Sequence, residues 1–323
     1  MSSAPQICAT VQRPSWWVRL LAAVPLPLLY GLSTCLAFVT SRVFPYRSHV
    51  VRPSLQMAFP QWSEAQLRDV TRRYYAGYSD VLVEIIKSAS LTPEQINARV
   101  TFVNLEFAQA YLRRERPVLL LGGHQCNWEW MLLALSLKLG WPLDAAYKPL
   151  VNPWAEREML AVRSRFGARL VPSQQLLEDI IRRRTVVRAI ALVADQEPVT
   201  SELKHWTRFL NRDSAFFLGA EQVSRKMRYA ALFITMRRTA RGHYEIGFDL
   251  LADPSVETLA PGEFTDRYAR RVEAQIREAP ADWPWSHKRW RLRKPLYGGG
   301  SGGSGGSGGN GSSGSSSADS ASG

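Results

Sequence analysis

The sequence predicts an α/β fold, with a mainly parallel central sheet flanked by helices and an N-terminal membrane-associated helix. Short apolar runs alternate with amphipathic segments between residues 117 and 194, which is typical of parallel sheets with helices on their faces. An uncharged stretch of 21 residues, Leu20 to Thr40, precedes them. Apolar residues make up 46% of the chain, which is enough for a core and excludes a disordered or collagen-like protein.

Composition divides the chain into three parts. Residues 1–45 contain the uncharged stretch and are predicted to be a membrane anchor segment. Residues 46–297 have the size and the alternating pattern of one domain. Residues 298–323 are almost entirely Gly and Ser, so they cannot form a core and are predicted to be a disordered tail.

The stretch Leu20 to Thr40 has about the 20 residues that a helix needs to span a membrane. Pro25 and Pro27 remove helix donors, so a kinked or shallowly inserted helix fits the sequence as well as a straight span does. An uncleaved anchor is favoured over a signal peptide, because the apolar run is long and no small-residue cleavage site follows it. A buried core helix is the remaining alternative. Three basic residues after the stretch favour a domain on the cytoplasmic side: Arg42, Arg47 and Arg52.

The elements of the domain follow from local patterns. A helix is predicted over 63–89, where Ser63 and Gln66 form a capping box and apolar residues recur at helical spacing. The apolar run 117–121 ends at Gly122 and Gly123 and predicts a strand buried on both faces. The other predicted helices are 106–116, 127–139, 153–166, 174–184 and 215–228. The other predicted strands are 143–148, 168–171, 186–194, 230–235 and 244–250.

The chain is strongly basic, with a net charge of +13 at pH 7. An excess of this size favours an anionic partner, such as anionic lipid, an acidic protein or nucleic acid. The three cysteines, Cys8, Cys35 and Cys126, are widely separated and form no CxxC pair. Neither a disulfide framework nor a metal site is therefore expected.

Polar side chains follow several of the predicted strands. Ligands of open parallel sheets bind at the carboxyl ends of the strands, so these residues are the first candidates for a site. His124 follows the first predicted strand, Lys148 ends the second, and Asp195 and Gln196 follow the strand at 186–194.

His124 and Glu129 are the candidate catalytic residues. His124 lies at a strand-to-helix turn, and Glu129 lies about one turn inside the helix that follows. A carboxylate that accepts from one ring nitrogen leaves the other nitrogen free to take a proton from a hydroxyl. The amides at the helix N-terminus would suit an oxyanion. In the alternative interpretation, His124 caps the turn and Glu129 is a solvated helix residue.

Several blocks resemble bacterial lipid A secondary acyltransferases. Gly122-Gly123-His124 and Asn127-Trp128-Glu129 resemble the HX4(D/E) block of that family. Further blocks occur in the same order: 47–60, Tyr147-Lys148-Pro149, Arg165-Phe166-Gly167-Ala168, Ala194-Asp195-Gln196 and the aromatic, basic segment 283–290. The resemblance covers roughly residues 15 to 295. Its second block usually has Arg where this chain has Lys148, which affects how a phosphate is bound.

The resemblance implies acyl transfer from an acyl carrier protein thioester to a hydroxyl of a lipid A precursor, without a cofactor or a metal. Residues 46–297 would be the acyltransferase domain, at the cytoplasmic face of the inner membrane. His124 would be the general base and Glu129 its orienting partner. The candidate substrate contacts are Lys148, Asp195, Gln196 and Asn127, with Lys148 on a headgroup or phosphate and Asp195 as a supporting acid. Acyl coenzyme A is the alternative donor.

Other interpretations remain open from the sequence. The same His–Glu pair would serve acylation of a glycerophospholipid or another glycolipid. A non-catalytic basic adaptor for membranes or nucleic acid would need neither residue, although no nucleic acid is expected as a partner. The segment 283–294 would place its tryptophans at a membrane interface, or pack them on the domain. Cys126 is interpreted as a small apolar filler rather than a nucleophile.

Overall fold

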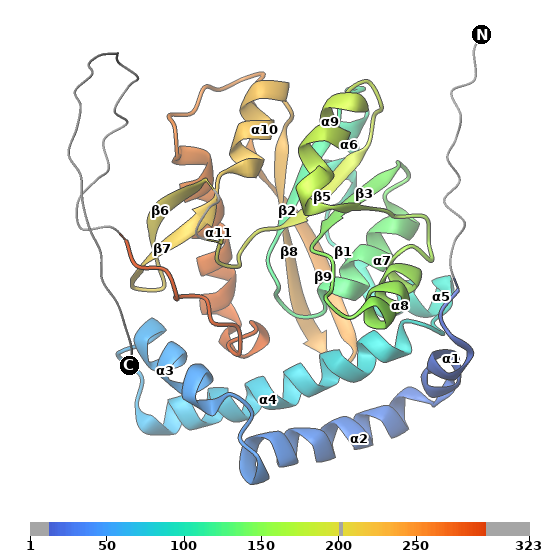
Figure 1. Cartoon of the computed structure of the whole chain (residues 1–323), viewed down its shortest axis with the longest axis vertical. Helices are drawn as coiled ribbons and strands as arrows, with labels where there is room; N and C mark the ends of the chain where they lie inside the picture. The colour runs from blue at the N-terminus through green and yellow to red at the C-terminus, as the bar shows by residue number, and fades with distance from the viewer. Residues whose placement is uncertain (1–12, 200–202, 295–323) are drawn as a thin grey trace, which may run out of the picture.

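The computed structural model describes residues 13–199 and 203–294, and the tail predicted from residue 298 lies outside them. Seven strands form one sheet in the order β1-β9-β8-β2-β5-β3-β4, and all neighbours are parallel except β8 and β9. The predicted fold class, a mainly parallel sheet flanked by helices, is confirmed (Figure 1). The strands of the sheet are β1 (Val100–Phe102), β2 (Val118–Gly122), β3 (Leu143–Tyr147), β4 (Arg169–Pro172), β5 (Ala189–Val193), β8 (Ala231–Ala240) and β9 (His243–Ala252).

Strand β2 is the centre of the sheet and separates two cores. All five of its residues are buried. Because side chains alternate along a strand, Leu119 and Leu121 enter one core and Val118 and Leu120 enter the other. The first core is covered by α9 (Leu176–Arg182), α10 (Gly219–Met227) and α11 (Glu263–Glu278). The second is covered by α5 (Pro93–Asn97), α6 (Leu105–Leu112) and α7 (Trp128–Lys138).

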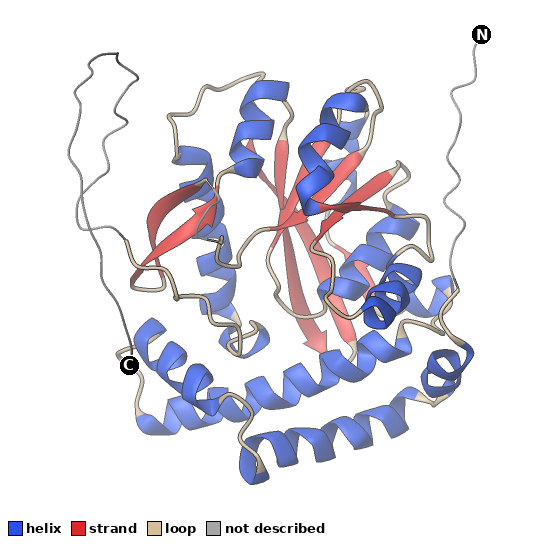
Figure 2. Ribbon diagram, in the orientation of Figure 1, coloured by secondary structure: helices blue, strands red, loops and turns tan. Residues whose placement is uncertain are grey.

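A layer of helices lies across the carboxyl edge of the parallel strands. The arrowhead of β8 points toward the long helix α4 (Glu64–Lys87), and β2 runs parallel to β8 (Figure 2). Ser63 and Gln66 form the predicted capping box at the start of α4. Helices α3 (Ser48–Ala58) and α8 (Pro153–Arg163) also lie on this side of the sheet. The turns that follow β2 and β5 therefore face these helices.

The apolar N-terminal stretch forms two helices rather than one. Helix α1 (Trp16–Ala23) ends before Pro25, and α2 (Leu26–Phe38) begins after it and continues into a π-helical turn, η1 (Val39–Val43). The kink expected from the prolines is thus present, because proline at the start of α2 cannot donate to the preceding turn. In the part of the chain that the structure describes, one helix, Leu26–Val43, is long and apolar enough to cross a membrane.

Two predicted elements differ from the structure. The helix expected over 215–228 begins only at Gly219, because the preceding residues form a two-stranded antiparallel hairpin, β6 (Lys204–Phe209) with β7 (Arg212–Phe217). The strands expected at 230–235 and 244–250 are longer and pair with each other as an antiparallel hairpin. The remaining short turns are η2 (Ser173–Gln175) and η3 (Pro280–Asp282).

Candidate active site

His124 and Asp195 are brought together by the pairing of β2 with β5. Gly122 is the register partner of Val193, so the residues two positions beyond each strand lie side by side. The backbone of Gly123 lies against Asp195, so that a Cβ atom there would be 3.4 Å from Oδ2 of Asp195. The side chain of Asp195 is almost fully buried, and that of His124 is 18% exposed.

Asp195 fixes the orientation of the His124 ring. Its Oδ1 lies 2.6 Å from Nδ1 of His124, and its Oδ2 accepts from the His124 backbone N–H at 3.0 Å and from the Trp283 indole at 2.8 Å. Burial alone would raise the pKa of Asp195, but the His124 ring and these donors outweigh it and lower the pKa to about 2. When Asp195 accepts from Nδ1–H, the other ring nitrogen, Nε2, is the one that can accept a proton.

The Nε2 atom of His124 has Gln196 beside it. The Gln196 side-chain nitrogen lies 3.3 Å away, which is a long hydrogen bond. Gln196 and His124 both line one pocket, so a ligand hydroxyl that enters this pocket competes with Gln196 for Nε2.

The structure corrects the expectation that Glu129 orients His124. Glu129 accepts from Arg163, at 2.5 Å to Oε1 and 2.8 Å to Oε2, and from the Trp128 indole at 3.1 Å. Its carboxylate is thus held by α8 rather than by the imidazole. Trp128 is the α7 residue that packs edge to face on the His124 ring, with ring centroids 5.1 Å apart. Glu129 and Arg163 both line the pocket.

Asn127 is also placed differently from the expectation of a substrate contact. It is fully buried and caps α7, because its Oδ1 accepts from Trp130 N at 2.9 Å. Its Nδ2 donates to Glu84 at 2.7 Å. Both ends of the amide are therefore used inside the protein.

The pocket beside His124 has a volume of about 620 Å³. Its lining includes the polar side chains Lys148, Gln196 and Arg163, of which Lys148 is exposed, and the exposed apolar residues Leu150 and Val151. Its other walls come from strands that run away from His124 and from α7, and they are apolar: Leu120, Met131, Leu135, Ala145, Leu170, Ala191 and Ile234. A cleft that is polar at one end and apolar at the other suits a ligand with a reactive head and a hydrocarbon chain.

The C-terminal segment completes the site, and it does not carry its tryptophans at the surface. Trp283 and Trp285 are buried, which agrees with the alternative that they pack on the domain and not with a place at a membrane interface. Arg289 is 1% exposed and donates to the carbonyls of Asp195 and Ala215 at 2.7 and 2.6 Å. His287 lines the pocket, and burial lowers its pKa to about 4, so its ring is neutral at pH 7.

Three residues of the site were not identified from the sequence: Arg163, Trp283 and His287. Arg163 has no local signal, because one arginine in a helix rich in charged residues is unremarkable by pattern. Trp283 and His287 lie in the aromatic, basic segment that was noted, but their contacts depend on how the segment folds back onto the sheet.

Cys126 is buried, and its thiol donates to the Met236 carbonyl at 3.4 Å. Burial raises its pKa well above the usual value, so the thiol stays protonated. This agrees with the interpretation of Cys126 as a filler. Within residues 13–199 and 203–294, no three His, Cys, Asp or Glu side chains are grouped so that they could hold a metal ion.

The fold and the site define an α/β protein with a carboxylate-bound histidine at the carboxyl edge of its sheet, beside a pocket for a partly apolar ligand. Residues 15–292 match the family described as bacterial lipid A biosynthesis acyltransferase. The chain therefore belongs to this family and is an acyltransferase, as the resemblance of its motifs implies.

Two curated relatives share 22% of their residues with this chain. One is a lipid A biosynthesis acyltransferase of Haemophilus influenzae, aligned over 87% of this chain and 90% of the relative. The other is a lipid A biosynthesis lauroyltransferase of Escherichia coli, aligned over 91% of this chain and 97% of the relative. Among solved structures, the 1-acyl-sn-glycerophosphate acyltransferase PlsC of Thermotoga maritima aligns with 80% of this chain and 100% of its own. Its TM-score is 0.38 at 13% identity, a likeness too distant to support an argument.

Proposed function

We propose that this protein transfers a fatty acyl chain from an acyl thioester to a hydroxyl of a lipid A precursor, with His124 as the general base. The observation that carries the proposal is the 2.6 Å contact between Nδ1 of His124 and the buried Asp195 at the mouth of a pocket with apolar walls. The family and the names of both curated relatives favour lipid A as the acceptor class.

In the proposed reaction, Nε2 of His124 takes the proton of the acceptor hydroxyl while its oxygen attacks the thioester carbonyl carbon. The tetrahedral intermediate collapses with loss of the thiolate. The imidazolium of His124 then gives its proton to the leaving thiolate, which restores the neutral base. Asp195 stays ionised throughout and stabilises the positive ring. Such base catalysis contributes roughly 10²- to 10⁴-fold in rate.

Arg163 is proposed to place a positive charge beside the reacting groups. Two of its five N–H donors are used by Glu129, and the side chain lines the pocket. The remaining donors suit the oxyanion of the intermediate or a phosphate of the acceptor. Glu129 then acts by positioning Arg163 rather than His124, and Lys148 at the exposed mouth is a further candidate contact for a phosphate.

The acyl chain is proposed to lie along the apolar walls of the pocket. Ala191 lies on β5, four residues before Asp195, so the wall extends about 13 Å from the site at the usual rise of a strand. The net charge of +13 suits an anionic donor, which can be an acidic carrier protein or the phosphate-bearing coenzyme A thioester.

The test compares His124→Gln with a matched control, His205→Gln. His205 also pairs with a carboxylate, Asp266 at 3.0 Å, but lies on β6. Detergent-solubilised enzyme is incubated with a labelled acyl donor, either lauroyl carrier protein or lauroyl coenzyme A. The acceptor is a lipid A precursor or a lysophospholipid. We expect turnover to fall by at least 10²-fold in His124→Gln and to stay unchanged in His205→Gln. Full activity of His124→Gln would overturn the mechanism, and preference for the lysophospholipid would overturn the acceptor.

A further inference from the structure

Helix α2 presents two different faces. Leu26, Leu29 and Ser33 are buried, and the two leucines belong to the same core as Val83 of α4. The opposite face carries large apolar side chains that the protein leaves exposed: Leu28 at 66%, Leu32 at 60% and Phe38 at 63%.

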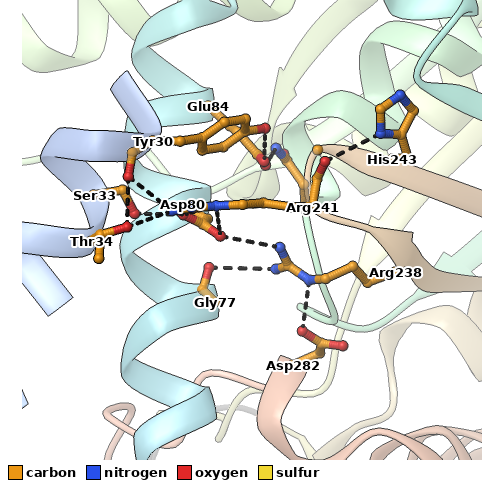
Figure 3. Close-up of polar contacts among 12 residues, drawn as sticks. Tyr30, Ser33, Thr34, Gly77, Asp80, Glu84, Arg238, Arg241, His243 and Asp282 are labelled. Carbon is orange, nitrogen blue, oxygen red and sulfur yellow. Dashed lines mark hydrogen bonds and ion pairs between the residues drawn. The ribbon is translucent and has the colours of Figure 1, made fainter. Parts of the chain in front are cut away.

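A set of polar contacts fixes the inner face of α2 to the rest of the protein (Figure 3). Ser33 donates to Asp80 of α4 at 2.5 Å. Arg241, at the tip of the β8–β9 hairpin, donates to the same carboxylate at 2.6 Å. The Arg241 guanidinium also reaches the Tyr30 carbonyl at 2.9 Å and the Thr34 hydroxyl at 3.1 Å. We call these five residues, Tyr30, Ser33, Thr34, Asp80 and Arg241, the α2 clasp.

Further contacts extend along the helix pair in both directions. The Tyr30 hydroxyl donates to Glu84 at 2.8 Å, four residues further along α4 than Asp80. Lys87 donates to the carbonyls of Ala22 and Val24, at the junction of α1 and α2, at 2.7 and 3.1 Å. The helices thus run antiparallel and in contact along α2, as Figure 1 also shows.

This attachment conflicts with a transmembrane orientation of α2. If α2 crossed the hydrocarbon core, it would take Asp80, Glu84 and Arg241 with it, together with the α4 backbone and the hairpin tip. A charged side chain at the centre of a bilayer costs about 2.5 to 3.5 kcal/mol even on the lowest scales. The other faces of α4 pack on the sheet core, so α4 cannot leave the domain to accompany α2.

We infer that α1 and α2 lie flat in the membrane interface, with the exposed face of α2 toward the acyl chains and the clasp toward the domain. The protein is then bound to one leaflet and does not span the bilayer. This inference rests on the contacts of α2 and does not depend on the proposed acyl transfer.

The charge around α1 and α2 identifies the lipid surface. The sequence contains no Asp or Glu before Glu64 but five arginines, at positions 13, 19, 42, 47 and 52. Trp16, Phe44 and Tyr46 are exposed near the ends of the segment, where aromatic rings favour the headgroup region. Anionic headgroups attract each nearby arginine by about 1 kcal/mol, so the partner is an anionic leaflet.

The position of α2 in the membrane interface also determines where the pocket opens. Tyr46 and Arg47 lie three and four residues after the end of η1, and both line the pocket beside His124. With α2 in the interface, the pocket opens at the level of the headgroups, where a lipid hydroxyl is found. An acceptor then reaches His124 without leaving the leaflet.

The first test measures the side of the membrane on which two residues lie. Cys8 and Cys35 are replaced by serine, the buried Cys126 is kept, and one exposed cysteine is introduced as Arg13→Cys or as Lys226→Cys. Both positions are exposed, and Lys226 lies on α10. A membrane-impermeant maleimide is applied to inside-out and to right-side-out vesicles. We expect both cysteines to react in the same vesicle type, and reaction from opposite sides would overturn the inference.

The second test measures depth. Spin labels are attached to Leu28→Cys, Leu32→Cys and Val39→Cys, which share the exposed face of α2 and η1. The protein is bound to vesicles of phosphatidylethanolamine with one quarter phosphatidylglycerol. An interfacial helix predicts one shallow depth for all three labels, whereas a maximum at position 32 would overturn the inference. Equal binding to vesicles without phosphatidylglycerol would overturn the assignment of an anionic surface.

Discussion

Asp195 and His124 are 71 positions apart, yet their side chains meet at 2.6 Å because each lies two residues beyond a paired position of β5 and β2. The backbone of the sheet, rather than a flexible loop, sets this distance. Trp283 and the His124 backbone amide occupy the second oxygen of Asp195, so the carboxylate has little freedom to rotate.

Replacing Asp195 with asparagine tests the role of this contact. An amide donates to Nδ1 of His124, which moves the ring proton to Nε2 and removes the base. We expect turnover to fall by about 10³- to 10⁴-fold with little change in the Michaelis constant. Asp266→Asn, which alters the pair formed with His205, is the matched control. Steady-state kinetics of both variants decide the point, and a tenfold or smaller loss for Asp195→Asn would contradict it.

The pair of Glu129 and Arg163 calls for a double-mutant cycle. If Glu129 acts by positioning Arg163, the variants Glu129→Gln and Arg163→Gln each lose activity and the double variant loses little more. Removing one partner of a buried pair also destabilises the fold, by about 3 to 5 kcal/mol. The exposed pair of Arg237 and Glu245 is the control, for which less than about 1 kcal/mol is expected. Fully multiplicative losses of turnover would show that the two residues act independently.

The apolar wall predicts how chain-length preference changes. Ala191→Leu fills space on the β5 side of the pocket, so the longest acyl chains no longer fit. Each methylene left unburied costs about 0.8 kcal/mol, or about fourfold in kcat/KM. Mass spectrometry of products from mixed acyl donors is expected to show a shift toward shorter chains. Ala155→Leu on α8, at a position that does not line the pocket, should leave the distribution unchanged.

His287 predicts a pH dependence of stability. Burial lowers its pKa from 6.5 to about 4, so the unfolded chain takes up a proton at a higher pH than the folded one does. The buried, neutral ring of His287 therefore contributes fully to the free energy of unfolding above pH 6.5, and this contribution is lost as the pH falls toward 4. We expect the free energy of unfolding to fall by about 1 kcal/mol more in the wild type than in His287→Gln over this window. Urea titrations in detergent at several pH values measure the free energy of unfolding, with His49→Gln as the exposed control. The same pH dependence in the wild type and in His287→Gln would contradict the role of His287.

The sequence predicted most of the regular elements and the position of the site, but not the partners within it. Periodicity and caps locate α4, β2 and α7, because these signals lie within a few residues of each other. The partner of His124 depends on the order of strands in the sheet, which local patterns do not contain. Glu129 was the carboxylate nearest in sequence, whereas Asp195 is the one that β5 places beside the ring.

Other differences have the same physical origin. Trp283 and Trp285 have the composition of an interfacial belt, and only the fold-back of their segment onto the sheet decides that they are buried. The prolines at positions 25 and 27 left a kinked helix and a straight span equally open from the sequence, and the structure has a break between α1 and α2 at Pro25. The antiparallel hairpin of β6 and β7 was missed because its residues alternate only weakly between buried and exposed.

Asp195 depends on residues near position 283 and position 289 for two of its contacts, through the Trp283 indole and the Arg289 guanidinium. A ribosome has therefore made nearly all of the described chain before the carboxylate of Asp195 can be held in place. The α1–α2 segment is made long before these residues. If Asp195 supports catalysis as proposed, a partly synthesised molecule is therefore inactive.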